Sequence, residues 1–284
     1  MGEKASENIK AEDWAGEMGE RWLAHIDKFE GMIAPIGDAL VAAVKVRPGE
    51  RILDIGCGAG ATTLALARAA GATSRVVGLD ISPSLSRAAA RRAEEAGLSN
   101  TTFITGDAGT RPLEKGAYDV LFSRFGVMFF EDPYAAFANL RTGLNDKGRM
   151  LFACWAPPME NEWIVDVMQC VMRHVEMQPP TPRAPGPFAF AEPDYVTDIL
   201  TKAGFSDVKI EPWRGVQYLG GKGMRAKEAA EFVLNALSIG DMARKQPPEV
   251  QAALLRDITE AFAAKETPEG VAMKATAWFV SAKP

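Results

Sequence analysis

The sequence predicts an α/β fold, with a doubly wound, mostly parallel seven-stranded sheet, helices on both faces, an antiparallel last strand and helical cap insertions. Three observations predict it. Strand-like and helix-like segments alternate from Glu50 to about Trp155. A glycine-rich turn joins the first strand to the helix that follows, and the alternation resumes after an insertion near residue 191.

The expected elements follow from apolar runs and their stop signals. Strands are expected where short apolar, β-branched segments occur, at 51–55, 76–80, 102–105, 118–123, 149–155, 208–211 and 271–281. Helices are expected at 62–70 and 83–96, each followed by glycine, at 133–144 before the turn 145–148, and at 193–203 before Gly204.

The remaining segments suggest how one domain over 1–284 is organised. We expect an N-terminal helical lid at 1–49, a core at 50–155, a cap insertion at 156–190, further core at 191–224, a helical insertion at 225–265 and the last strand within 266–284. In the cap, the helix 160–177 carries an apolar stripe, and the stiff proline-rich run 179–187 follows it. The second insertion shows two amphipathic helices.

The glycine-rich run after the first strand is the clearest binding signal. Gly56, Gly58 and Gly60 alternate directly before a helix, where a backbone without Cβ atoms can approach a ligand closely. The run also satisfies the relaxed dinucleotide fingerprint. It resembles the first motif of class I S-adenosylmethionine (SAM)-dependent methyltransferases.

Three acidic residues favour SAM over NAD as the ligand. Asp80 ends the second strand, where a carboxylate can accept both ribose hydroxyls, and Asp107 ends the third strand on the same sheet edge. Asp54, just before the glycines, would repel a pyrophosphate but suits the amino group and sulfonium of SAM.

The resemblance implies further cofactor contacts. In the resembled family the acid at the third strand accepts the adenine amino group while the next backbone unit reads the ring, and an N-terminal segment often covers the cofactor. The expected cofactor residues are Asp54, Gly56, Cys57, Gly58, Gly60, Asp80, Ile81, Gly106, Asp107, Ala108, Ser123, Trp14 and Trp22. The two tryptophans share one helical face if the helix continues through Gly16 and Gly19, and packing of this segment on the sheet is an equal alternative.

The segment 123–133 resembles the small-molecule branch that includes ubiquinone and menaquinone biosynthesis methyltransferases. Members of that branch often carry histidines after this strand, whereas this chain has aromatic residues and methionine. The expected acceptor pocket is therefore apolar, with about half of the aromatic candidates serving only the core. It comprises Arg124, Phe125, Met128, Phe129, Trp155, Phe188 and Phe190, with Met159 and Trp163 on the same segments.

The polar and charged side chains expected near this pocket could each have a functional or a structural role. Arg124 could bind a carboxylate of the acceptor or pair with Glu131 or Asp132, and the second is favoured. His174, Tyr195 and Glu160 are weak candidates for a general base, each more often structural or solvated.

Composition narrows the function further. The net charge of −5 argues against nucleic acid as the main partner, and no apolar stretch is long enough to insert into a membrane. We expect a cytoplasmic enzyme with a small-molecule acceptor and no metal, because three scattered cysteines and two histidines show no ligand spacing. A homodimer is left open. The alternatives are an NAD(P)-linked oxidoreductase that uses the same glycine loop, and a SAM-binding module without catalysis.

Overall fold

The computed structural model describes residues 11–177 and 181–284, and the first part of the expected proline-rich linker, 179–180, lies outside them. The main sheet has the strand order β3-β2-β1-β4-β5-β8-β6, and a short strand, β7, pairs with β8. The strands are β1 Arg51–Ile55, β2 Arg75–Asp80, β3 Thr101–Thr105, β4 Tyr118–Arg124, β5 Leu144–Trp155, β6 Ser206–Tyr218, β7 Glu266–Thr267 and β8 Gly270–Lys283. The chain therefore reverses its direction of winding between β1 and β4, where such sheets bind their ligands.

The pairing confirms the predicted α/β fold class. Strands β1 to β5 run parallel, while β8 is antiparallel to both β5 and β6 and lies between them. Strand β1 is buried along four of its five residues, as expected for a strand covered on both faces.

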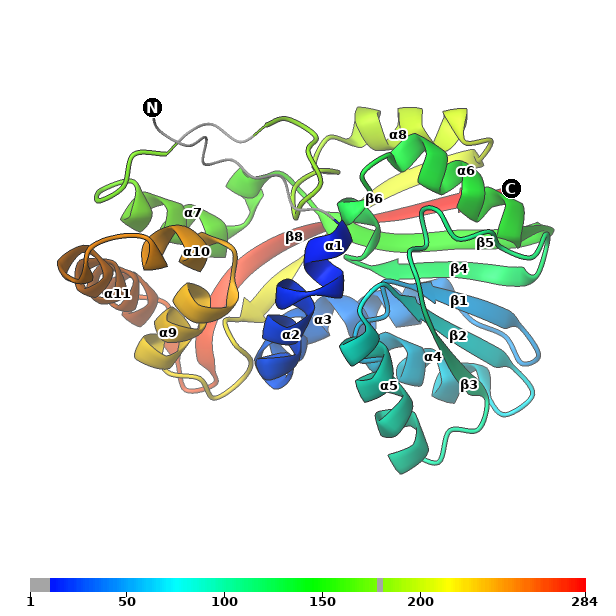
Figure 1. The fold of residues 1–284 in the computed structure, drawn as a ribbon, viewed down its shortest axis with the longest axis horizontal. Coiled ribbons are helices and arrows are strands. Elements are labelled where there is room, and N and C mark those ends of the chain that lie inside the picture. The colour runs from blue at the N-terminus through cyan, green and yellow to red at the C-terminus, as the bar shows by residue number, and fades with distance from the viewer. Residues whose placement is uncertain (1–10, 178–180) are drawn as a thin grey trace.

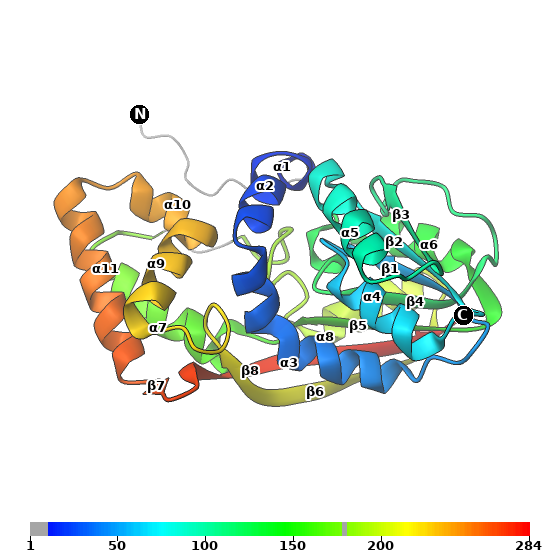
Figure 2. The ribbon, with the colours of Figure 1, turned by 90° about the horizontal axis from the view of Figure 1, so that it is seen from below.

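Helices cover both faces of this sheet (Figures 1 and 2). They are α1 Ala11–Ala15, α2 Glu17–Ala24, α3 Ile26–Val44, α4 Ala61–Ala70, α5 Pro83–Glu95, α6 Pro133–Gly143, α7 Glu162–Val171, α8 Pro193–Lys202, α9 Ala226–Ala236, α10 Ile239–Arg244 and α11 Pro248–Ala263, with 3-10 turns at Val127–Phe129 and Pro158–Glu160. In Figure 1, α4 and α5 lie on one side of the sheet and α6 and α8 on the other, while α7, α9, α10 and α11 gather around the far ends of β6 and β8. None of the helices in the described part of the chain is both long and apolar enough to cross a membrane.

Two expected boundaries near β5 and β6 were wrong. The segment 145–148, expected to be a turn, belongs to β5, because α6 ends at Gly143 and β5 begins at Leu144, opposite Tyr118 of β4. The strand expected at 208–211 is only part of β6, which pairs with β8 over nearly its whole length. Cross-strand pairing with β8 extends a segment whose own apolar signal is short.

The expected cap helix over 160–177 is shorter than predicted. It begins after Asn161, whose side-chain amide donates to the carbonyls of Ala156 and Pro157 and whose Oδ1 accepts from Thr276 N. This buried residue ties the cap to β8 and fixes where α7 starts. The helix ends at Val171, and the next residue of the predicted stripe, Met172, is 65% exposed.

The second insertion has three helices instead of two. The extended residue Leu237 separates α9 from α10, and the chain then folds back so that a Cβ built on Gly240 would clash with the carbonyl oxygen of Leu234. Only glycine permits this approach. Of the two glycines in the N-terminal segment, Gly16 separates α1 from α2, whereas α2 runs through Gly19 without a break.

Candidate active site

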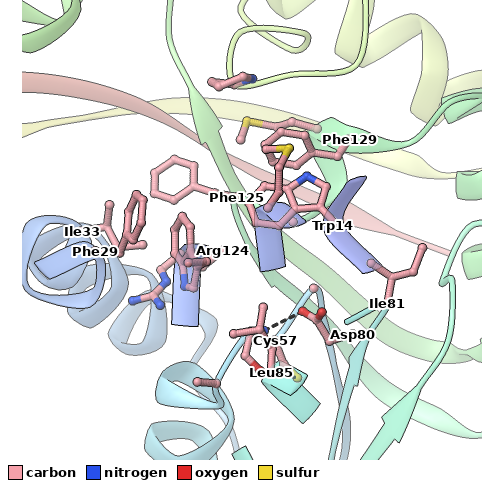
Figure 3. A pocket seen from close by; sticks show the side chains of 18 of the residues that line it. Trp14, Phe29, Ile33, Cys57, Asp80, Ile81, Leu85, Arg124, Phe125 and Phe129 are labelled. Carbon is pink, nitrogen blue, oxygen red and sulfur yellow. Dashed lines mark hydrogen bonds between the residues drawn. The ribbon is translucent and has the colours of Figure 1, made fainter. Parts of the chain in front are cut away.

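A cavity of about 220 Å³ opens at the carboxyl ends of β1, β2 and β4, at the reversal of strand order (Figure 3). Its floor is the glycine turn after β1, its sides come from the strand ends, and the N-terminal helices cover it. Ten of the expected cofactor residues line it: Gly56, Cys57, Gly58, Asp80, Ile81, Gly106, Asp107, Ala108, Trp14 and Trp22.

The glycine turn is a cradle that side chains would fill. Gly56 has a φ of 64°, and a Cβ on it would lie 2.7 Å from the Cα of Gly126, two residues beyond the end of β4. Gly58 has a φ of 56° and faces Trp22 across the cavity. The two chain segments therefore meet backbone to backbone, and the turn leaves room for a ligand above it.

Asp80 ends β2 and lies on the cavity wall beside this turn, only 8% exposed. Its Oδ2 accepts from Gly58 N at 2.7 Å and its Oδ1 accepts from Ser82 N at 2.9 Å. Burial raises the pKa of this carboxyl, although the two backbone hydrogen bonds act to lower it. Each oxygen keeps a second lone pair, so the carboxylate can still accept two hydroxyl groups.

Asp107 follows β3 and shapes a turn at the cavity edge. Its oxygens accept from Gly109 N and Thr110 Oγ1, both at 2.8 Å. With Ile81 and Ala108 on the same wall, this end of the cavity offers an apolar surface beside polar backbone groups.

The lid carries aromatic side chains that meet across the helix break. Trp22 stacks on Phe29 of α3 with centroids 3.9 Å apart, and Trp14 contacts Trp22 edge-on at 5.8 Å and Phe129 at 4.9 Å. The guanidinium of Arg21 binds both carboxylate oxygens of Asp241, at 2.9 and 3.0 Å, which joins α2 to α10 above the cavity. Both sequence alternatives are therefore present, since α1 and α2 cover the cavity while α3 packs on the sheet.

The opposite end of the cavity is aromatic. Phe125 stacks on Trp155 with centroids 4.3 Å apart, and Trp155 lies 5.8 Å from Trp163 of α7. Phe125 has a φ of 63°, an uncommon conformation for a bulky residue, which turns the chain after β4. Met128 and Phe129 complete this wall, so five of the seven expected pocket residues line the cavity: Arg124, Phe125, Met128, Phe129 and Trp155.

Other expected cofactor residues lie behind the cavity wall. Asp54 is fully buried beneath the glycine turn, and its Oδ2 accepts from Thr62 and Thr63, both at 2.7 Å. Ser123 Oγ donates to the carbonyl of Ile55 and accepts from Gly126 N, which joins the β1 and β4 ends. Asp54 and Ser123, like Gly60 at the start of α4, support the turn and do not face the ligand space.

Phe188 and Phe190 do not line the cavity either. Phe190 is 2% exposed and packs against Phe137 and Phe152 in the core. Phe188 stacks on Trp163 from behind, and Met159 is 80% exposed.

The three expected base candidates also lie elsewhere. His174 Nε2 and Asp257 Oδ2 are 2.8 Å apart, Tyr195 packs under the guanidinium of Arg183, and Glu160 pairs with Arg214. Within 11–177 and 181–284, no histidine, tyrosine or lysine lines the cavity. Over the same residues there is no cluster of three potential metal ligands.

Sequence reasoning missed several lining residues: Met18, Arg21, Glu30, Ile33, Thr62 and the helix end 236–238. Helical spacing could have placed Met18 beside Trp14 and Trp22, because these residues are four apart along the chain. No local signal marks 236–238, the end of α9 and the link that follows it, because these residues reach the cavity through the packing of distant segments.

The cradle and the acid at β2 fit SAM. A backbone turn without side chains, a carboxylate with free lone pairs and the absence of a basic phosphate cluster among the lining residues are what a nucleoside-binding site at a doubly wound sheet requires.

Comparison with known proteins extends this assignment. Residues 52–148 match the family described as a methyltransferase domain. Nocamycin O-methyltransferase from Saccharothrix syringae is 30% identical over 184 residues, which cover 62% of this chain and 66% of that protein. Aklanonic acid methyltransferase DauC from Streptomyces sp. (strain C5) is 31% identical over 150 residues, which cover 51% of this chain and 68% of that protein.

A more distant likeness supports the fold alone. The solved structure of phosphoethanolamine N-methyltransferase 2 from Haemonchus contortus has a TM-score of 0.59 at 16% identity, covering 97% of this chain and 60% of that one. The alignments with the two named relatives span about two thirds of each relative's length. The chain belongs to the class I SAM-dependent methyltransferases, and its cofactor is SAM.

Proposed function

We propose that this enzyme transfers a methyl group from SAM to a small apolar or aromatic molecule. The observation that carries the proposal is the continuity of the cavity, which runs from Asp80 to a wall of Phe125, Met128, Phe129 and Trp155. A flat or extended apolar molecule would bury its surface against this wall.

The cofactor assignment is part of this proposal. Asp80 would accept the ribose hydroxyls, and the wall formed by Ile81 and Asp107 would hold the adenine. The glycine turn would lie under the amino-acid part, and Trp14 and Trp22 would exclude water from above. The contacts of Asp80 with two backbone amides hold its carboxylate in one orientation, which supports this role.

Methyl transfer from SAM depends mainly on the alignment of the acceptor atom with the methyl group and the sulfur. SAM supplies an activated methyl group on sulfur, and transfer is an in-line displacement that forms a bond from the acceptor to the methyl carbon and breaks the sulfur–carbon bond. Holding the partners in line can supply roughly 7 to 11 kcal/mol of the barrier. Rigid stacking of Phe125 on Trp155 and of Trp22 on Phe29 is suited to hold two planar groups in a fixed relation.

The cavity also favours a particular acceptor atom. The acids on its wall are Glu30, Asp80 and Asp107, and Glu30 is bound by Arg92. None of these acids lies at the aromatic wall, so no carboxylate there could act as a general base. The acceptor atom would therefore have to be nucleophilic by itself, as an oxygen that is already ionised at neutral pH would be. The names of the two relatives, an O-methyltransferase and an acid methyltransferase, are consistent with this choice.

Product detection tests the proposal. The protein would be incubated with methyl-labelled SAM and a panel of aromatic carboxylic acids and acidic phenols, and labelled products would be separated and identified. We expect at least one product, absent with Asp80→Ala protein. If calorimetry shows that S-adenosylhomocysteine binds, but no labelled product forms with any metabolite extract, the protein is a binding module without catalysis.

A further inference from the structure

Arg124 is the cavity residue whose chemistry is not used by the assignments above. It ends β4, and it lines both the cavity and a groove formed by α3 and α4. Figure 3 shows its side chain in the cavity, on the side of Phe29 and Ile33. A Cβ on Gly37 of α3 would lie 2.8 Å from its Nη1, so the small residue makes room for the guanidinium. The fold therefore accommodates a partly buried cation beside the ligand space.

No carboxylate of the described chain forms an ion pair or hydrogen bond with Arg124, although several lie near it. The carboxylate of Glu30 is bound by Arg92 at 2.7 and 2.8 Å, and Asp54 accepts from two threonines. The expected pairing with Glu131 or Asp132 was wrong, because Asp132 caps α6 through Ala135 N and neither acid is within ion-pair distance of Arg124.

An unpaired guanidinium in this place is costly. Burial lowers the pKa of Arg124, while Glu30, Asp54 and Asp38 act to raise it without touching the side chain. A ligand that closed over this cation would take its donors out of water, and a planar guanidinium is suited to bind a carboxylate through two parallel hydrogen bonds. An anionic ligand group would supply both the opposite charge and the hydrogen-bond acceptors for this guanidinium.

The strand order indicates which anionic group of a bound ligand would lie at Arg124. Across the sheet edge, the adenine wall follows β3, Asp80 follows β2, the glycine turn follows β1, and Arg124 ends β4. A ligand laid along this order with its ribose at Asp80 extends its amino-acid part past the glycine turn to β4. The aromatic wall also begins here, at Phe125, so a carboxylate of the acceptor is a second source of the same chemistry.

We propose that Arg124 is a carboxylate-binding residue of this cavity, and that the α-carboxylate at the amino-acid end of the cofactor is its ligand. The assignment rests on the placement of the cofactor in the proposed function.

Binding measurements with matched ligands test it. Calorimetry would compare S-adenosylhomocysteine with 5′-deoxy-5′-methylthioadenosine, which lacks the amino-acid part, for wild type, Arg124→Met and Arg124→Lys. The control is Arg68→Met, which removes the same charge from an exposed position on α4. Circular dichroism and thermal melts would check that each variant is folded.

Loss of a charge-assisted contact predicts that Arg124→Met weakens S-adenosylhomocysteine binding by about 10- to 100-fold. Binding of the methylthio compound should change less than about threefold, Arg124→Lys should lie between, and Arg68→Met should match wild type. Equal weakening of both ligands by Arg124→Met would overturn the proposal, because it would indicate a general loss of structure.

A second arm separates the two sources. With S-adenosylhomocysteine bound, wild type and Arg124→Met would be titrated with 1-naphthoate and 1-naphthamide. If Arg124→Met leaves cofactor affinity unchanged but removes a preference for naphthoate, Arg124 binds a carboxylate of the acceptor instead. If Arg124→Met changes neither the affinity for S-adenosylhomocysteine nor the preference for naphthoate over naphthamide, Arg124 does not bind a carboxylate. Wild-type protein that binds neither S-adenosylhomocysteine nor the methylthio compound would refute the proposed function itself.

Discussion

Asp54 gives the sharpest test of the electrostatics beneath the glycine turn. Its side chain is fully buried, Oδ2 accepts from Thr62 and Thr63, and Oδ1 has no hydrogen-bond partner. Burial raises its pKa from 3.8 to about 6, against the two threonine hydroxyls and the nearby Arg124, which act to lower it. The folded protein therefore binds this proton more tightly than the unfolded chain does.

The sign of the effect follows from that difference. A carboxyl whose folded pKa is raised stabilises the fold fully below its unfolded pKa, and this contribution is lost as the pH rises through the folded pKa. For Asp54 the window lies between about pH 4 and pH 6. A pKa shift of roughly two units, at 1.36 kcal/mol per unit, means that ionisation of the buried Asp54 lowers the free energy of unfolding by about 3 kcal/mol at neutral pH, relative to acidic pH.

Asp54→Asn removes the titration while keeping the shape and the acceptor oxygen for the threonines. We expect the variant and the wild type to have similar free energies of unfolding near pH 4, and the variant to be more stable by about 3 kcal/mol at pH 8. Urea titrations at several pH values, without cofactor, would measure this difference. Because Asp54 does not line the cavity, the variant should still bind S-adenosylhomocysteine.

Asp119→Asn is a control of opposite sign. Burial would raise the pKa of Asp119, but hydrogen bonds from Arg51 N and Asn145 Nδ2 lower it overall. The folded pKa of Asp119 lies below its unfolded value, so this variant should lose stability relative to wild type as the pH rises through the range below about pH 5, and the difference should then stay constant. A difference between Asp54→Asn and wild type that stays constant from pH 4 to pH 8 would refute the reasoning about Asp54.

Three further predictions concern the cavity. Asp80→Ala should weaken S-adenosylhomocysteine binding by about 2 to 4 kcal/mol in a folded protein, which calorimetry would measure; unchanged affinity would remove Asp80 from the site. Gly56→Ala should lower the free energy of unfolding by roughly 1 to 3 kcal/mol or more, because of its positive φ and the contact with Gly126, and a denaturant titration that shows no loss would contradict the close approach. Trp163→Ala should raise the KM for an acceptor identified by product detection while leaving cofactor affinity unchanged, and a loss of cofactor affinity instead would place Trp163 at the wrong end of the cavity.

Local signals in the sequence were sufficient for the core of the fold and for the placement of the glycine turn and Asp80. The glycine turn and Asp80 are positioned by a strand, a tight turn and a helix that follow each other within a few residues, so their relation is set by backbone geometry. Helix propensity placed a possible interruption at Gly16 or Gly19, and only the structure shows that the chain breaks at Gly16 while α2 runs on through Gly19.

The acceptor end depended on contacts between segments far apart in the chain. Phe190 and Trp163 looked alike in sequence, yet Phe190 packs into the core and Trp163 lines the cavity, because the direction of each side chain depends on how the cap sits on β8 through Asn161. Arg21 contacts Asp241 across 220 positions, which no local pattern reveals.

The sequence alone therefore determined the α/β class and the positions of the glycine turn and of Asp80 at the ends of β1 and β2, because each depends on short-range backbone preference and on the period of apolar residues. Only the tertiary structure decided that Asp54 lies under the turn instead of on the cavity wall, that Arg124 has no acidic partner in the described chain, and that Asp241 of α10 binds Arg21 of α2. Those outcomes depend on burial and on the partners that distant segments bring, and both arise only when the whole chain packs.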